Sequence, residues 1–496
     1  MCAVAIVNFS RLPRRGNFSR GFQRFQRAAM LPAAMEVDSA AAPPSVAVDE
    51  ALRSCDTLRR HEYSALLAAL AITLCGGMGG AIMPFLMEPI ATEFSYASWE
   101  RSVLASSQFV GMWIGSIVGG VIADASGPGR AMMLSLVGLT VGGVAPTILP
   151  NLASSARVLV GLSLTISYQA GNTWLAESIP TSSRSLALSA LHISIAVGGL
   201  LSVGLAVLID AWRPLLLVNT APTVVAGLLL GRFVLRHESA RWLLVSGRHD
   251  RALEVLRRIA RRSGAAPPHA LHEEGGGGGG AKADEASTLP LARAGGGAWR
   301  RRWRELRHKS LWRLHVLGSL VCFTLNFGSK GAELWMGAYV TSIGLDSISR
   351  SVYFASQGGK IVGDLLNIRF SHRVGRLRAL QLSFFGAGAA LLAFCFVATP
   401  PALLALAFLG TVCQDIVWCN VYMYLAEAYP TSVRNSAFGL VMGAGRFGGI
   451  LSTALGGVLP SIRVAFVLQS VAFVVGGFLS CAFGLETSRR SLRDAV

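Results

Sequence analysis

Residues 175–184 read LAESIPTSSR, and residues 425–434 read LAEAYPTSVR. Seven of the ten positions match at one constant offset of 250 residues, among them the pairs Glu177/Glu427, Pro180/Pro430 and Arg184/Arg434. Each copy closes a long apolar run with a charged turn, and a proline stops the helix there. The chain is therefore a duplication, in which each half repeats one membrane-spanning design.

The composition indicates an integral membrane protein. Of 496 residues, 52% are hydrophobic and 15% are charged, and the mean hydropathy is +0.51, which is too apolar for a soluble protein of this size. The basic residues behind the net charge of +18 lie in the N-terminal tail and between apolar runs. Loops on the cytoplasmic side of a membrane collect Lys and Arg in this way. The expected large partner is the lipid bilayer, and nucleic acid is not expected.

A helix needs about 20 apolar residues to cross a bilayer. Suitable windows are 64–87, 102–123, 131–149, 157–175, 186–208, 214–233, 311–343, 351–367, 380–398, 402–425, 437–459 and 464–485. They predict an all-α membrane protein of about twelve transmembrane helices, in two six-helix pseudo-symmetric bundles at 63–234 and 311–485. Residues 1–62 form a predicted disordered tail, 235–310 a cytoplasmic linker with the glycine run 275–280, and 486–496 a cytoplasmic tail. Parallel repeats of this kind are typical of secondary transporters.

Charge placement predicts that both termini and the linker are cytoplasmic. Six arginines precede the first acidic residue, Glu36. The N-terminal segment is therefore interpreted as an organellar transit peptide, a disordered cytosolic tail, or an extension upstream of a later start at Met30 or Met35. The plasma membrane and an organelle membrane, including that of a plastid or mitochondrion, therefore both stay open. The eight cysteines show no CxxC or Cys/His spacing, so no disulfide framework, metal site or cofactor is expected. Sequence motifs of enzymes, such as HExxH and GxSxG, do not occur.

Four short motifs occur in a consistent order. Residues 119–130 read GGVIADASGPGR, and residues 372–378 read HRVGRLR. Both resemble the Asp-Arg-x-Gly-Arg-Arg loop of the major facilitator superfamily. Residues 238–248, ESARWLLVSGR, look like the signature after helix 6 in its sugar-porter, organic-ion and synaptic-vesicle-protein-like branches, and residues 486–492, ETSRRSL, are similar to the one after helix 12. The departures are Ala125, His372 and His237.

The resemblance implies a set of gating charges at the cytoplasmic face. They are Asp124, Arg130, Glu177, Arg184, Glu238, Arg241, Arg373, Arg376, Glu427, Arg434 and Glu486. Exposed ion pairs are worth only about 0–1 kcal/mol, so such pairs can act as reversible latches that hold the outward-facing state. The alternative is that these residues only anchor the loops to the cytoplasmic side.

Ionisable residues at membrane depth are costly and therefore point to function. Lys330 with Glu333, and Lys360 with Asp364, are spaced so that each pair could neutralise itself on one helix face. His192 is interpreted as a packed, hydrogen-bonded histidine, and Gly111, Gly115 and Gly119 as a small-residue packing face. The candidate substrate-binding residues are Gln169, Asn172, Asn326, Lys330, Glu333, Trp335, Asp415, Trp418, Tyr422 and Arg446.

Arg446 decides the expected substrate. It lies in the middle of an apolar window and has no acid three or four residues away. A guanidinium can bind a carboxylate through two parallel hydrogen bonds. Anion carriers of the family tend to carry an arginine in this region, so the resemblance implies a small organic anion, while an ion pair with Asp415 or Asp364 is the structural alternative.

The expected function is transport of a small-molecule substrate by alternating access, by a monomer, with protons open as the coupling ion. The stretch 326–335, NFGSKGAELW, looks like the organic-ion and synaptic-vesicle-protein-like branch and lacks the paired glutamines of sugar porters. A sugar or organic-cation transporter of the same fold is the alternative. A receptor or regulatory membrane protein that has lost transport is a further one.

Overall fold

The computed structural model describes residues 59–179, 181–263, 309–429 and 434–483. All of them fall within one compact unit, Ala41–Val496. Every regular element in these ranges is a helix. The first half contains α4 (Arg59–Ala81), α5 (Met83–Glu93), α6 (Ser98–Ser126), α7 (Pro128–Ile148), η2 (Pro150–Leu152), α8 (Ala153–Ser178), α9 (Thr181–Leu208), α10 (Trp212–Arg236), α11 (Ala240–Val245) and α12 (His249–Ser263). The second half contains α14 (Lys309–Ser342), η4 (Asp346–Ile348), α15 (Ser349–Val374), α16 (Arg376–Phe394), α17 (Pro400–Ala428), α18 (Arg434–Val458) and α19 (Ile462–Cys481).

The helices confirm the predicted twelve-helix architecture. Nine spans in the described ranges are long and apolar enough to cross a membrane, and α4 and α5 count together as the span Tyr63–Glu93. The other three long helices are α8, α14 and α15. All three contribute polar side chains to an internal cavity, among them Tyr168, Lys330 and Lys360, and this lowers their hydropathy.

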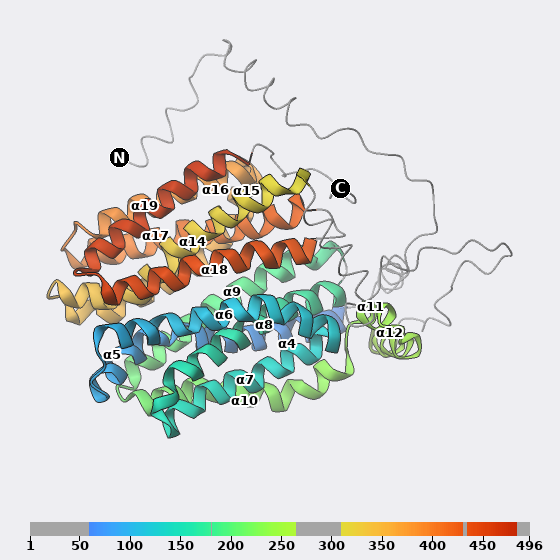
Figure 1. Ribbon diagram of the computed structural model, residues 1–496. Helices are drawn as coiled ribbons and strands as arrows, with labels where there is room; N and C mark the ends of the chain where they lie inside the picture. Colours follow the sequence, from blue (N-terminus) through green and yellow to red (C-terminus); the bar gives the residue numbers. More distant parts are fainter. Residues whose placement is uncertain (1–58, 180, 264–308, 430–433, 484–496) are drawn as a thin grey trace, which may run out of the picture. The chain divides into compact units, whose positions relative to one another are not determined.

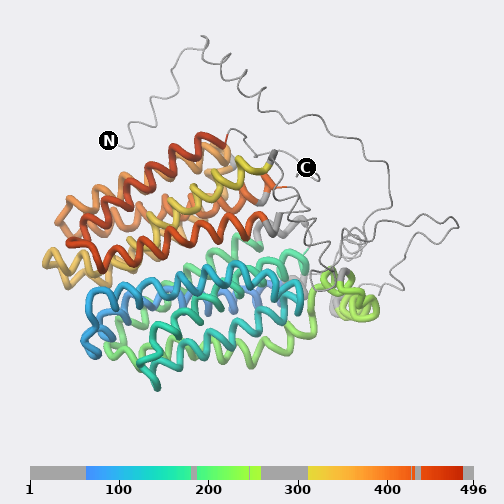
Figure 2. The backbone as a smooth tube through the Cα atoms, viewed as in Figure 1, coloured from blue at the N-terminus to red at the C-terminus, as the bar shows by residue number. Residues whose placement is uncertain are grey.

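The helices form two bundles that follow the two halves of the sequence. Helices α4 to α10 pack on one another, as do α14 to α19. The bundles meet where α6 packs against α18 and α9 packs against α15. In Figure 1 the blue-green and yellow-red halves lie side by side with their helices running in one general direction, and Figure 2 shows the same course of the backbone.

The loops of the two similar motifs at 119–130 and 372–378 take the same backbone conformation in both halves. Gly127 ends α6 with a φ of 98°, and Gly375 ends α15 with a φ of 93°. Only glycine adopts this region without strain, so each turn needs its glycine before the next helix starts. We call the end of the bundles that carries these two turns the motif end.

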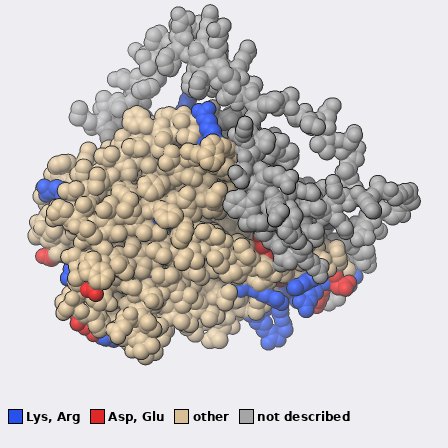
Figure 3. Space-filling view, in the orientation of Figure 1, with Lys and Arg blue, Asp and Glu red and all other residues tan. Residues whose placement is uncertain are grey.

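The outer surface is suited to lipid. Large apolar side chains such as Leu208 and Leu228 are 80% and 78% exposed. On the face drawn in Figure 3, the charged side chains gather toward the two ends of the helices, and the band between them is almost free of charge. This distribution matches a bilayer core between two polar interfaces.

The linker region contains structure that the sequence analysis did not assign. Helices α11 and α12 lie in it and pack together through Leu243, Leu244, Val255 and Leu256. The predicted bundle limits at 234 and 311 lie within two residues of the end of α10 and the start of α14. The glycine run 275–280 and the predicted tails 1–62 and 486–496 lie wholly or almost wholly outside the described residues.

Candidate functional site

A cavity of about 200 Å³ lies between the two bundles. The first half contributes residues of α4, α5, α6, α8 and α9, and the second half contributes residues of α14, α15, α17 and α18. Its charged lining consists of Lys330, Glu333, Lys360, Asp415 and Arg446. A site between two parallel repeats is where transporters of this design hold their substrates.

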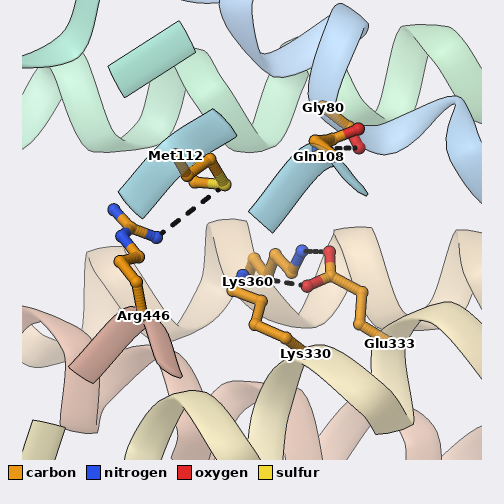
Figure 4. Close-up of polar contacts among 7 residues, drawn as sticks. All are labelled: Gly80, Gln108, Met112, Lys330, Glu333, Lys360 and Arg446. Atoms are coloured by element: carbon orange, nitrogen blue, oxygen red, sulfur yellow. Dashed lines mark hydrogen bonds and ion pairs between the residues drawn. The ribbon is translucent and has the colours of Figure 1, made fainter. Parts of the chain in front are cut away.

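Glu333 holds two lysines at once. Its Oε2 accepts a hydrogen bond from Nζ of Lys330 at 3.1 Å, and its Oε1 pairs with Nζ of Lys360 from the neighbouring helix (Figure 4). The three side chains are only 13–21% exposed. The predicted pair of Lys330 with Glu333 is therefore present, whereas Lys360 reaches across to α14 instead of pairing with Asp364 on its own helix. The triad carries one excess positive charge.

Arg446 lies on α18, is 8% exposed, and points into the cavity. Its Nη1 lies 4.0 Å from the sulfur of Met112 across the cavity, and its Nε has no hydrogen-bond partner (Figure 4). Within the described part of the chain no carboxylate forms an ion pair with it, so the structure does not contain the alternative pair with Asp415 or Asp364. A buried guanidinium without a counter-charge is costly.

Aromatic rings from both bundles form one wall of the cavity. Trp418 and Tyr422 stack with their centroids 5.8 Å apart, and Tyr168 of the first half meets Tyr422 at 5.9 Å. Nζ of Lys330 lies 5.4 Å from the ring centroid of Trp418. Nearby, Gln108 donates from Nε2 to the carbonyl of Gly80 at 3.3 Å, and its Oε1 has no partner among the described residues. This wall can stack a planar solute and hydrogen-bond its polar edge.

Six of the ten predicted substrate-binding residues line this cavity, namely Lys330, Glu333, Asp415, Trp418, Tyr422 and Arg446. The structure places the other four elsewhere. Asn172 donates to the carbonyl of Tyr168 at 2.8 Å, Asn326 to that of Cys322 at 2.8 Å, and Trp335 to that of Thr453 at 2.9 Å. Gln169 lies beside Gly119, against α6.

Several further residues line the cavity that were not among the predicted binding residues. They include Gln108, Met112, Tyr168, His192, Gln357 and Lys360. Lys360 carried a signal, because a charge at membrane depth is costly. The others are ordinary helix residues, and only the packing of the bundles brings them to one surface.

The predicted gating charges of the first half gather at the motif end. Glu238 is 7% exposed and accepts hydrogen bonds from the backbone N–H of Gly129 at 2.8 Å and of Arg130 at 3.3 Å. Burial raises the pKa of Glu238, and these N–H groups at the start of α7 act against that rise. Glu177 accepts a hydrogen bond from the hydroxyl of Ser239.

Further contacts complete this cluster. The indole of Trp242 donates to the carbonyl of Asp124 at 2.9 Å, and Arg241 acts electrostatically on Glu177. The side chains of Arg130 and Arg373 are exposed.

In the second half, Arg376 at the start of α16 forms an ion pair with Glu427 at 2.7 Å, and these side chains are 19% and 23% exposed. The side chains of Arg184 and Arg434, and the whole of Glu486, lie outside the described residues. The gating role of all these charges stays a proposal.

Comparisons with known proteins agree with this architecture. The family model of the Major Facilitator Superfamily matches residues 65–359 and 350–495. The chain is 26% identical over 495 residues to the organic cation/carnitine transporter 7 of Arabidopsis thaliana, with 90% of this chain and 96% of that protein covered. It is 25% identical over 431 residues to the cis,cis-muconate transport protein of Acinetobacter baylyi, covering 84% and 93%.

Among solved structures, the inward open xylose transporter XylE from E. coli aligns with a TM-score of 0.65 at 16% identity, over 87% of this chain and 98% of that one. This likeness shows the fold alone. Taken together, the duplicated helical halves, the central cavity and the family match show that the chain belongs to the Major Facilitator Superfamily and is a multi-pass membrane transporter, not an enzyme.

Proposed function

We propose that this transporter moves a small organic anion across the membrane, and that Arg446 binds its carboxylate. The observation that carries the proposal is the buried guanidinium, which lines the cavity and pairs with no carboxylate of the described chain. A carboxylate bound there would gain two charge-assisted hydrogen bonds in a site of low dielectric constant.

The rest of the cavity supports the same class of substrate. The triad of Lys330, Glu333 and Lys360 adds one excess positive charge, and Trp418 with Tyr422 can stack against a planar carbon skeleton. One relative is named for the transport of cis,cis-muconate, which is an unsaturated dicarboxylate. We therefore favour planar carboxylates over aliphatic ones.

An organic cation suits this cavity less well. Two relatives are named as organic cation transporters. A cation would need a carboxylate that is open to it, but both oxygens of Glu333 already bind lysines. Asp415, the other acid in the described lining, is acted on electrostatically by Asp364 as well as by Lys360 and Lys330.

Alternating access follows from the position of the cavity. Its lining is divided between two bundles, so rocking of one bundle against the other would open it to each side in turn. The Lys and Arg residues near the motif end support a cytoplasmic location for that end. The motif-end clusters around Glu238 and around Arg376 with Glu427 are then the proposed cytoplasmic latches.

Substitution of Arg446 tests the anion site. We expect Arg446→Lys to weaken anion binding at least about tenfold, because one hydrogen bond to a charged group is worth about 1.5–3 kcal/mol. Arg446→Ala should abolish measurable binding. Affinity can be read by competition between labelled and unlabelled benzoate or muconate on purified protein.

Arg157 offers a matched control. It is also buried, at 3% exposure, and lines a separate small pocket inside the first bundle. Arg157→Lys should leave anion affinity unchanged at equal yields of folded protein. Anion binding that survives in Arg446→Ala would show that Arg446 has only a structural role.

A further inference from the structure

Three side chains that can bind metal ions meet where the bundles join. His192 comes from α9, Asp364 from α15 and Cys419 from α17. One ligand atom of each lies within 4.8 Å of the others. Asp364 and Cys419 are 4% and 8% exposed, while His192 lines the central cavity. We propose that this cluster binds a thiophilic divalent cation such as Zn²⁺, and that the bound ion links the two bundles.

The donor set has the chemistry of a zinc site. Thiolate, imidazole and carboxylate are the three ligand types that Zn²⁺ takes in proteins, and Cd²⁺ binds the same set. With bonds of about 2.0–2.3 Å, the ligand atoms of a tetrahedral site lie roughly 3.3–3.8 Å apart. Cys419 already donates its thiol hydrogen to Oδ1 of Asp364 at 2.9 Å. On binding, that proton leaves to solvent and the thiolate takes the metal.

A second observation points to a cationic ligand at this place. Oδ2 of Asp364 is buried and accepts no hydrogen bond from an N–H, hydroxyl or thiol group among the described residues. The carboxyl group of Asp415 interacts with Asp364, so a second acidic side chain lies beside the cluster. A buried carboxylate without a cationic partner is costly, and a metal ion would supply one.

The surroundings can complete and orient the site. The hydroxyl of Tyr168 forms a hydrogen bond of 2.5 Å with Nε2 of His192, and such an outer contact fixes the plane of a ligating imidazole. His192 also lines the cavity, which gives a route for the ion and for a water molecule as fourth ligand. The distances along the chain between residues 192, 364 and 419 explain why ligand spacing in the sequence gives no sign of this site.

The site has a consequence for transport that does not depend on the substrate. His192 belongs to the first bundle, and Asp364 and Cys419 belong to the second. An ion held by all three would resist any movement that separates α9 from α15 and α17. Binding of Zn²⁺ is therefore expected to slow the alternating-access cycle.

The test measures metal binding to the purified full-length protein in detergent, so it does not require knowledge of the substrate. Equilibrium dialysis against Zn²⁺ should give one tightly bound ion that both His192→Gln and Cys419→Ser weaken at least about tenfold. With Cd²⁺, the ultraviolet absorption of the metal–thiolate bond should appear in the unchanged protein and be absent in Cys419→Ser. The matched controls are Cys481→Ser and His249→Gln, which alter an exposed cysteine and an exposed histidine.

Thermal unfolding of each variant shows whether it is folded before binding is compared. Equal Zn²⁺ affinity in the unchanged protein and in Cys419→Ser would overturn the proposal, as would a Cd²⁺–thiolate band that persists in Cys419→Ser. Loss of binding in the two control variants would assign the metal to the surface and would equally overturn it. None of these outcomes depends on whether the transported solute is an anion.

Discussion

The charge balance of the cavity is set by individual residues. Lys330, Lys360 and Arg446 face Glu333 and Asp415, and the distances show which of them are already engaged. Glu333 binds both lysines, while the guanidinium of Arg446 has no acidic partner in the described chain. The unpaired guanidinium of Arg446 is therefore the reason for proposing an anion, because its positive charge is buried and fixed at one place in the cavity.

Glu333 is expected to be important for stability as well as for charge. In Glu333→Gln both lysines lose their shared carboxylate, and we expect the free energy of unfolding to fall by about 3 kcal/mol, since breaking a buried pair leaves an uncompensated charge. Thermal or denaturant unfolding in detergent measures this change. Glu88→Gln is the control, because its pair with Arg101 is 49% and 36% exposed and should be worth about 0–1 kcal/mol. Equal effects of the two substitutions would contradict the buried triad.

Part of the site could be predicted from single residues. The spacing of Lys330 and Glu333 on one helix predicted their pair. The same reasoning paired Lys360 with Asp364, although Lys360 instead reaches Glu333 on another helix. For Arg446 the sequence left both an anion site and an ion pair with Asp415 or Asp364 open. Asn326 and Trp335 have the right depth, but Asn326 bonds to a carbonyl of its own helix and Trp335 to one of α18. A hydropathy window predicts how deep a residue lies in the membrane. The direction in which its side chain points depends on which helices surround it.

At the scale of the helix, glycines allow the closest contact in the first bundle. A side chain on Gly111 of α6 would collide with the backbone carbonyl of Val158 on α8, and one on Gly161 of α8 would collide with that of Gln108 on α6. Because neither glycine has a side chain, the backbones of α6 and α8 can approach each other closely. The spacing of Gly111, Gly115 and Gly119 predicted such a face, while its partner α8 could be identified only from the structure.

Alanine substitutions on α6 separate packing from helix propensity. Gly111→Ala should destabilise the protein by about 1–3 kcal/mol, because an added methyl group at a close helix contact forces the helices apart. Gly120→Ala on the same helix should be neutral or slightly stabilising, since open space surrounds that position. The midpoint of thermal unfolding of the two variants, measured in one detergent, gives the comparison. A neutral Gly111→Ala would refute the close approach of α6 and α8.

At the scale of the whole molecule, two similar halves enclose one site. The repeat of residues 175–184 at 425–434 was sufficient to predict two bundles of six helices, since each copy ends a span in the same way. The contacts between the bundles lie beyond that prediction. They include the ion pair of Asp210 with Arg350 at 2.7 Å and the rings of Phe85 and Tyr353 at 5.0 Å.

An exposed ion pair and a single ring contact are cheap to break and to re-form. These two contacts would therefore cost little to open during a transport cycle. One buried apolar cluster, which includes Ile72, Leu136 and Trp174, lies wholly within the first bundle. A larger one contains residues of both bundles, such as Leu86 and Tyr339, so apolar packing also contributes to the interface.

Uptake by the purified full-length protein in proteoliposomes tests the central claim most directly. The panel contains labelled benzoate, muconate, a quaternary ammonium ion of similar size and xylose, each with and without an imposed proton gradient and against protein-free vesicles. We expect saturable uptake of at least one of the two carboxylates, and none of the ammonium ion or the sugar. Saturable uptake of the ammonium ion or of xylose, with neither carboxylate transported, would contradict the assignment of an organic-anion carrier.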